Sequence, residues 1–274
     1  TTQLRSTVPD SKDNFRAGLR WAEDDKRRPR TLFPDLLRDI GSIDGLRRLR
    51  FTSPHPKDFR SEVIEAMAET SAVCEHLHLP LQSGSDRILA AMHRGYNKSK
   101  YMERLSEARK HIPDLAVTTD IIVGFPGETE KDFEETLALA AEAEFDGAYT
   151  FIFSPRPGTE AAEMVESYCD PSVAGERYDR LRSVILRSAL RKHEKRIGKS
   201  EEVIVEGPSK KNPDTTTGRT RQNKLVHFDS PRKLPIGSVA KVEIISASPR
   251  YLQGNLEEVI ATPARKTRIP VVAV

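Results

Sequence analysis

Residues 120–129 read Asp-Ile-Ile-Val-Gly-Phe-Pro-Gly-Glu-Thr, and this stretch decides the predicted fold. The β-branched run at residues 117–123 predicts a strand, Gly124 and Gly127 bracket a tight turn, and Thr129 stands where an amphipathic helix begins. Because the apolar run is nearly continuous, we expect a strand buried on both faces, as in a parallel sheet. The two glycines leave the turn backbone bare, so a ligand or another backbone can approach it closely.

A second stretch has the same layout. Residues 78–86 read His-Leu-Pro-Leu-Gln-Ser-Gly-Ser-Asp, the end of a strand followed by a polar turn. Ser85 or Asp86 is predicted to cap a helix that begins near Arg87. Strands alternate with helices throughout this part of the chain, which predicts βαβ units and a parallel sheet. Four strands are expected before a long helix at residues 175–197, namely residues 46–51, 73–81, 117–123 and 148–153.

The pattern changes after Gly198. Short strand-like segments separated by Gly- and Pro-containing turns follow, at residues 201–206, 225–229, 239–246 and 253–260. Short strands with regular turns indicate a small antiparallel barrel. We therefore predict an α/β chain with a partial (βα) barrel at 31–197 and a small antiparallel β-barrel at 198–262. A partly disordered lead-in is expected at 1–30 and a loosely ordered tail at 263–274.

Length and composition narrow the functional class. The 274 residues (30.8 kDa) suffice for a sizeable core. No stretch approaches the roughly 20 apolar residues of a membrane span, and two cysteines argue against a disulfide framework. We expect a cytoplasmic chain that does not enter membranes. Residues 198–274 carry 13 Lys+Arg and 8 Asp+Glu, a balance of +5, which is consistent with a polyanionic partner and equally with ordinary solubility charge.

Four motifs together resemble the methylthiotransferase branch of the radical S-adenosylmethionine (SAM) enzymes, and most closely its MiaB family. They are the two stretches above, Phe-Thr-Ser-Pro-His-Pro at 51–56, and Phe-Ser-Pro-Arg-Pro-Gly-Thr at 153–159. The resemblance runs from about residue 31 to about residue 259 in the family's order. It implies a partial radical SAM barrel followed by a TRAM domain, an RNA-binding β-barrel.

The resemblance also implies an activity, with its cofactors and partners. The family adds a methylthio group to C2 of isopentenyl-adenosine next to the anticodon, using SAM and 4Fe-4S clusters. The expected partner is the tRNA anticodon arm, the expected state is a monomer, and the sequence leaves the sulfur donor unassigned. Relatives that modify threonylcarbamoyl-adenosine or a ribosomal protein share the same motifs and stay open as alternatives.

The cysteines depart from the family pattern. The family holds one cluster on a Cys-x-x-x-Cys-x-x-Cys loop and a second cluster on three further cysteines, whereas this chain has only Cys74 and Cys169, in neither motif. By resemblance the chain is the carboxy-terminal portion of a longer enzyme and is inactive alone. The competing hypothesis is a cluster-less RNA-binding module that keeps the partial barrel as a scaffold.

The resemblance assigns SAM contacts to the two turns. Arg156 follows the fourth expected strand, and its guanidinium suits either the SAM carboxylate or an RNA phosphate, because it can pair with such groups bidentately. The predicted cofactor-binding residues are Gln82, Ser83, Asp120, Ile122, Gly124, Phe125 and Arg156. The alternative is that the polar ones cap helices or bond nearby amides, and that Arg156 makes a surface salt bridge. His76 and His78 have the spacing of some metal ligands, but without a third ligand a buried, hydrogen-bonded pair is favoured. We predict no catalytic and no metal-ligating residue within the chain.

The RNA contacts are predicted in the small barrel. Residues 218–224 match a recurring TRAM segment, so the resemblance implies RNA binding there. Arginine and lysine suit phosphates, and asparagine suits a base edge or the backbone. The predicted RNA-binding residues are Arg219, Arg221, Asn223 and Lys224.

Overall fold

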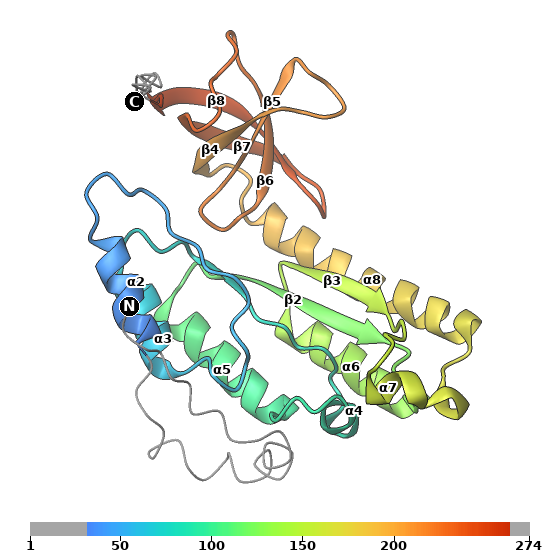
Figure 1. Cartoon of the computed structure of the whole chain (residues 1–274). Helices are drawn as coiled ribbons and strands as arrows, with labels where there is room; N and C mark the ends of the chain where they lie inside the picture. Colours follow the sequence, from blue (N-terminus) through green and yellow to red (C-terminus); the bar gives the residue numbers. More distant parts are fainter. Residues whose placement is uncertain (1–31, 264–274) are drawn as a thin grey trace, which may run out of the picture. The chain divides into compact units, whose positions relative to one another are not determined.

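The computed structural model describes residues 32–263 (Figure 1). It divides into two compact units, the first ending at Ala189 and the second beginning at Leu190, and we describe each by itself. The predicted lead-in at 1–30 and the tail beyond residue 263 lie outside the described residues. No described helix combines the length and apolar character needed to span a bilayer.

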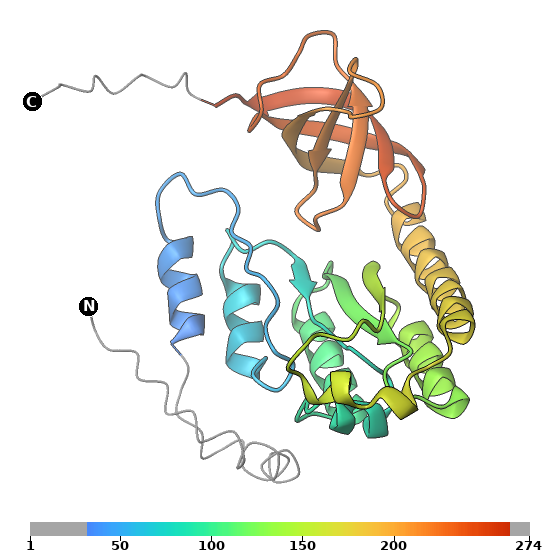
Figure 2. The ribbon, with the colours of Figure 1, turned by 45° about the vertical axis from the view of Figure 1, so that its right-hand side comes forward.

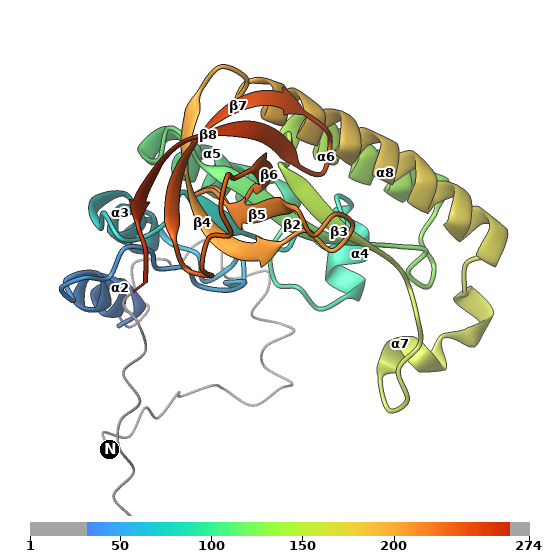
Figure 3. The ribbon, with the colours of Figure 1, turned by 90° about the horizontal axis from the view of Figure 1, so that it is seen from above.

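The first unit is a parallel sheet with helices packed against it. Its strands are β1 (His76–His78), β2 (Ala116–Val123) and β3 (Gly147–Ile152), which pair in parallel in the order β1-β2-β3. Its helices are α2 (Phe33–Gly41), α3 (Ser61–Glu69), α4 (Asp86–Ala91), α5 (Lys98–His111), α6 (Glu130–Ala143), α7 (Glu160–Glu163), the 3-10 turn η2 (Val165–Ser167) and α8 (Pro171–Glu194). Helices α2 and α3 lie side by side (Figure 2), and α8 is one uninterrupted helix (Figure 3).

Two strand predictions are wrong in extent. Residues 46–51 form no strand and contribute only an isolated bridge between Leu49 and Val73. The strand predicted at 73–81 shrinks to the three residues of β1. Pro80 has no amide hydrogen to donate, so the ladder cannot run through it. The sheet therefore has three strands within residues 32–263 rather than four.

The two faces of the sheet differ. Residues of β2 alternate, with Val117, Thr119, Ile121 and Val123 buried and the residues between them half-buried. The buried face packs against α3, α5, α6 and α8 in one core. The expectation that β2 is buried on both faces is thus wrong for the described residues, because its second face is only partly covered.

The second unit is a closed five-stranded barrel, visible at the C-terminal end of the ribbon in Figure 1. Its strands are β4 (Ser200–Pro208), β5 (Thr215–Arg219), β6 (Leu225–Asp229), β7 (Val239–Ala247) and β8 (Leu252–Ala261), in the order β4-β5-β6-β8-β7. Four pairings are antiparallel, whereas β6 and β8 pair in parallel. The predicted fold class, an α/β part followed by a small barrel, is confirmed.

Strand β5 was not predicted, because Gly218 suggested a turn. In the structure Gly218 lies inside the strand, where an added Cβ would sit 2.4 Å from the carbonyl oxygen of Ile204. Gly254 in β8 is similar, with Glu243 O at 2.4 Å. These glycines allow strands to cross closely in a barrel of small radius.

Candidate functional site

The turn between β2 and α6, residues 124–129, is held by the Glu128 side chain and by the backbone of Ser167. Gly124 and Gly127 adopt positive φ angles of 70° and 77°, which favour glycine. The Gly124 N–H donates to Glu128 Oε2 at 2.8 Å, and the Gly127 N–H donates to the Ser167 carbonyl at 2.7 Å. These bonds satisfy both amides and constrain the turn.

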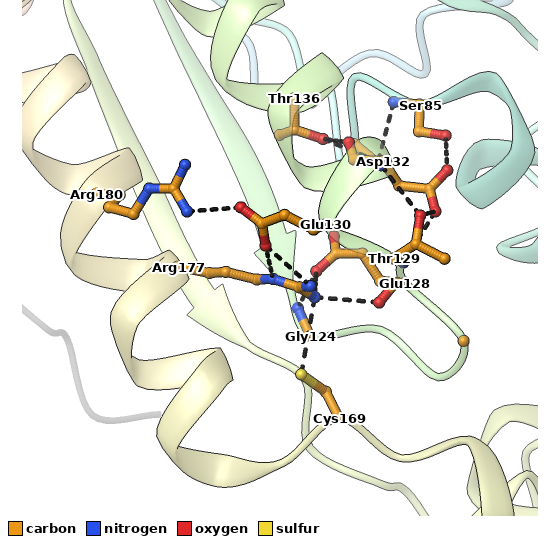
Figure 4. Close-up of polar contacts among 12 residues, drawn as sticks. Ser85, Gly124, Glu128, Thr129, Glu130, Asp132, Thr136, Cys169, Arg177 and Arg180 are labelled. Atoms are coloured by element: carbon orange, nitrogen blue, oxygen red, sulfur yellow. Dashed lines mark hydrogen bonds and ion pairs between the residues drawn. The ribbon is translucent and has the colours of Figure 1, made fainter.

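Arg177 on α8 clamps this turn from outside (Figure 4). Its Nη1 lies 2.9 Å from Glu128 Oε2 and 3.1 Å from the Glu128 carbonyl oxygen, and its Nη2 lies 3.2 Å from Glu130 Oε2. The Glu128 side chain is fully buried and that of Arg177 is 6% exposed. Burial raises the pKa of Glu128, although the Gly124 amide and Arg177 act in the opposite direction. The ion pair therefore joins α8 to the turn.

Asp132 joins the two sequence stretches that define the fold (Figure 4). Its Oδ1 accepts from Ser85 Oγ at 2.7 Å and from Arg87 Nε at 3.2 Å, and its Oδ2 accepts from the Thr129 amide at 2.9 Å. Thr129 and Asp132 form a complete capping box at the start of α6. Ser85 is the N-cap of α4, as predicted, but its hydroxyl bonds Asp132 and makes no cap bond.

The hydrogen bonds accepted by the Asp132 carboxylate should make the stability of the fold depend on pH. Burial by itself would raise the pKa of Asp132, but hydrogen bonds from Arg87, Ser85 and Thr129 outweigh burial and hold this pKa well below its usual value. A folded pKa below the unfolded one stabilises the fold above the unfolded pKa, about 3.9, and this stabilisation is lost as the pH falls towards the folded pKa.

We therefore expect Asp132→Asn to lower the urea midpoint of unfolding at neutral pH. The difference in midpoint between the variant and the wild type should become smaller below about pH 4. Urea titrations across this pH range measure this difference. Asp179→Asn, an exposed change on α8, should give a small difference that does not vary with pH. If the difference in urea midpoint between Asp132→Asn and the wild type did not change with pH, the Asp132 carboxylate would not be the source of the stabilisation.

Three of the predicted cofactor-binding residues have structural partners. Ser83 is fully buried, with its hydroxyl 3.3 Å from Thr136 Oγ1 and accepting from the Ser85 amide. The amide of Gly124 is bonded to Glu128. Phe125 is 6% exposed and packs edge-on against Phe153, with ring centroids 5.4 Å apart. The structure therefore gives these residues roles in shaping the turns.

Gln82 is the most suggestive of the others. It is a non-glycine residue at φ 67°, and its side-chain amide makes no hydrogen bond to any residue in the range 32–263. A strained backbone of this kind costs on the order of 1 kcal/mol and is often found at functional sites. Ile122 is half-buried on the partly covered face, and the Arg156 side chain is exposed in the loop after β3. The assignment of these residues to a cofactor stays a prediction.

Asp120 ends a chain of hydrogen bonds on the partly covered face of the sheet. Its Oδ2 lies 3.2 Å from His78 Nε2, His78 Nδ1 lies 2.9 Å from Thr118 Oγ1, and His76 Nε2 lies 3.2 Å from the same hydroxyl. Both histidines are thus hydrogen-bonded, through the shared Thr118 hydroxyl, as favoured from the sequence, but they are only half-buried rather than buried. In the sequence, these hydrogen bonds correspond to a His-x-His pattern in one strand and a Thr-x-Asp pattern in the next. The sequence does not show that the two patterns meet, because this depends on the strand register that pairs His78 with Thr118.

The described chain offers no site for an iron–sulfur cluster. Cys74 is buried beside the bridge at Leu49, and Cys169 precedes α8, 3.7 Å from Arg177 Nη1. Burial raises the pKa of the Cys169 thiol, which disfavours the thiolate that binds iron. Within residues 32–263 no three His, Cys, Asp or Glu side chains gather in a way that could hold a metal. These residues therefore do not fit a cluster.

The predicted RNA-binding segment is mostly engaged within the barrel. Arg219 pairs with Glu206 at 3.2 Å and donates to the Asn223 carbonyl at 3.0 Å. Asn223 has a φ of 63° and shapes the turn between β5 and β6. Lys224 is only 5% exposed, and Arg221 and Lys224 both have partners in the structure. Burial removes the physical basis for a phosphate contact by Lys224, and the other three assignments stay predictions.

Comparison with known proteins places both units. The Radical SAM superfamily matches residues 22–140, and the TRAM domain matches residues 194–256. Among solved structures, coproporphyrinogen III oxidase (HemN) from Escherichia coli, a radical SAM enzyme, aligns at 15% identity with a TM-score of 0.39, over 70% of this chain and 45% of that chain. That score is too low to carry an argument about the fold.

The curated relatives are much more similar. The tRNA-2-methylthio-N(6)-dimethylallyladenosine synthase of Corynebacterium jeikeium (strain K411) is 48% identical over 86% of this chain and 46% of its own length. The proteins of the same name from Tropheryma whipplei (strain Twist) and Moorella thermoacetica are 51% and 45% identical, over 86% and 82% of this chain.

The chain spans about half the length of these curated relatives: 46%, 51% and 50%. Its two matched regions stand in the order radical SAM, then TRAM, and one lies in each unit of the structure. The chain is therefore similar to these synthases over about half of their length, and it carries a region that matches the Radical SAM superfamily followed by one that matches the TRAM domain.

Proposed function

We propose that the chain is part of a radical SAM tRNA methylthiotransferase that replaces the C2 hydrogen of isopentenyl-adenosine, next to the anticodon, with a methylthio group. The observation that carries this proposal is the identity of 45% to 51% with synthases named for that product. The TRAM region and the tRNA named in the relatives support tRNA as the substrate. We further propose that the protein works in the cytoplasm, where tRNA is found, and that it acts as a monomer on the anticodon arm.

The residues at the sheet edge fit SAM. The unbonded amide of Gln82 suits a ribose hydroxyl, and Asp120 has one carboxylate oxygen held by His78, which leaves the other for a hydrogen-bond donor. Ile122 offers apolar surface for a purine. When bound, SAM supplies a methyl group and an adenosyl radical, and these side chains would hold and orient it.

The clusters that the family uses would need ligands from outside this chain. Its two cysteines are buried or beside Arg177, and the described residues form no cluster site. We therefore propose that the chain does not catalyse methylthiolation alone. A cluster-less RNA-binding module is the second candidate, and the lack of cluster ligands is the observation that favours it.

Deletion of the gene in its own organism tests the proposal. Nucleosides from digested tRNA, analysed by liquid chromatography and mass spectrometry, should lose 2-methylthio-isopentenyl-adenosine and accumulate isopentenyl-adenosine. Loss of the methylthio form of threonylcarbamoyl-adenosine would point to the alternative tRNA target. An unchanged set of methylthio nucleosides, with ribosomal proteins also unchanged, would favour the RNA-binding module.

A further inference from the structure

The barrel has two unlike ends. Loop 209–214 joins β4 to β5, and loop 230–238 joins β6 to β7. Because Thr215 pairs with Asp229 across β5 and β6, both loops leave the barrel at the same end, and Figures 1 and 2 show them there. We name these two loops the loop end. The opposite end holds the turn at 220–224 and the loop at 248–251.

The loop end displays uncompensated positive charge. Its four cations are exposed, and their side chains make no hydrogen bond or ion pair with any residue in the range 32–263: Lys210, Lys211, Arg232 and Lys233. Asp214 is the one carboxylate in the two loops. Exposed cations without carboxylate partners attract a polyanion more strongly than paired ones, because no local ion pair must be broken.

The loops have defined shapes. The Asp214 amide donates to Asn212 Oδ1 at 3.2 Å, and Ser230 Oγ donates to the Arg232 carbonyl at 2.8 Å. Leu234 is 9% exposed and anchors loop 230–238 in the barrel core. The charges are therefore carried on anchored loops, so less conformational entropy is lost when they engage a ligand.

The turn at 220–224 contrasts with this arrangement. Arg219 is tied to Glu206 and to the Asn223 carbonyl, and Lys224 is buried. Contact with a phosphate would require Arg219 to exchange these bonds, whereas the loop-end cations have none to lose.

We propose that the loop end, rather than the turn at 220–224, is the surface on which this barrel binds the RNA phosphate backbone. The inference rests on the proposed function for its partner, tRNA, and adds where on the barrel the RNA lies. Four cations from two neighbouring loops suit a chain of regularly spaced phosphates, and the Ser and Asn side chains between them suit phosphate and 2'-hydroxyl oxygens. Only Ile236 adds a large exposed apolar side chain to these loops, which argues against membrane insertion.

The test uses the whole chain and a fluorescent tRNA transcript, with affinity measured from about 50 to 200 mM salt. Two double variants each remove two loop charges: Lys210→Gln with Lys211→Gln, and Arg232→Gln with Lys233→Gln. A matched control, Lys110→Gln with Lys131→Gln, removes two exposed charges from the first unit. The rival site is tested by Arg219→Gln with Arg221→Gln.

Each loop variant should bind tRNA about tenfold more weakly. Its negative slope of log affinity against log salt should become less steep by about 2, because each lost phosphate contact releases about one counterion fewer. The control should match the wild type, and urea midpoints should confirm that all variants fold. Wild-type slopes in both loop variants, with a loss in the Arg219/Arg221 variant, would overturn the inference and leave tRNA binding intact. Failure of the wild type to bind tRNA would overturn both the loop-end inference and the proposed function. Binding to anionic vesicles instead of tRNA would identify a membrane as the partner.

Discussion

Replacing Arg177 with alanine should destabilise the first unit by about 3 kcal/mol or more, because it leaves the Glu128 carboxylate buried without its cation. Removing one partner of a buried ion pair typically costs about 3–5 kcal/mol. Glu128 is fully buried, its Oε1 already lacks a hydrogen bond within the described residues, and burial raises its pKa. The carboxyl can therefore take up a proton in the variant, which puts the expected cost at the lower end of that range.

Urea denaturation measures this cost, and Arg180→Ala is the matched control. Arg180 stands one turn along the same helix and pairs with Glu130 at 2.7 Å, with Glu134 and with Glu176 at 3.7 Å. Its side chain is 36% exposed, however, and these partners are exposed as well. An exposed pair contributes about 0–1 kcal/mol. Adding Glu128→Gln to the Arg177→Ala variant should recover part of the loss, because the neutral amide tolerates burial better than a charge. Equal losses for Arg177→Ala and Arg180→Ala would refute the clamp.

Gly84→Ala should be comparably damaging, for a steric reason. A Cβ on Gly84 would lie 2.6 Å from Thr136 Cα and 2.7 Å from the Glu135 carbonyl oxygen, both in the backbone of α6. Overpacking usually costs about 1–3 kcal/mol and more where the backbone must move, so we expect about 3 kcal/mol or more. The Gly84 amide also donates to Thr136 Oγ1 at 2.9 Å, and a shift of α6 would break that bond.

In contrast to Gly84→Ala, the Gly175→Ala substitution should increase the stability of the protein. Gly175 lies inside α8, and no heavy atom lies within 4 Å of a Cβ built there. Alanine should stabilise the chain by about 0.5–1 kcal/mol, because glycine loses more conformational freedom in a helix. The difference in urea midpoint between the two Gly→Ala variants therefore isolates the contact with α6. A Gly84→Ala variant as stable as the wild type would show that α6 is not fixed against this turn.

Local patterns predicted the elements that local chemistry determines. Helix α5 spans Lys98–His111, and the Asn97 side chain caps it by accepting a hydrogen bond from the Lys100 amide. Thr129 likewise caps the start of α6, because the capping box needs only Thr129 and Asp132, which are three residues apart in sequence. Such signals do not depend on what the segment later packs against.

The roles of several side chains depend on partners that are far away in sequence, and these roles could not be predicted. Arg177 and Glu128 are 49 residues apart, and one arginine among many in α8 carries no mark of its partner. Ser83 looks like a polar ligand residue in sequence, yet its hydroxyl meets Thr136 on α6. Lys224 looks like a phosphate contact, but the alternation along β6 and the turn before it bury the residue. In each case the fold, rather than the residue type, sets the role.

The parallel pairing of β6 with β8 has a consequence for synthesis on the ribosome. Residues 252–261 bond to β6 on one side and to β7 on the other, so they are the last piece of the ring. Until they emerge, β4 to β7 expose two unsatisfied strand edges and an apolar interior. The nascent barrel therefore passes through an open, aggregation-prone stage that ends only when the tenth residue of β8 has left the exit tunnel.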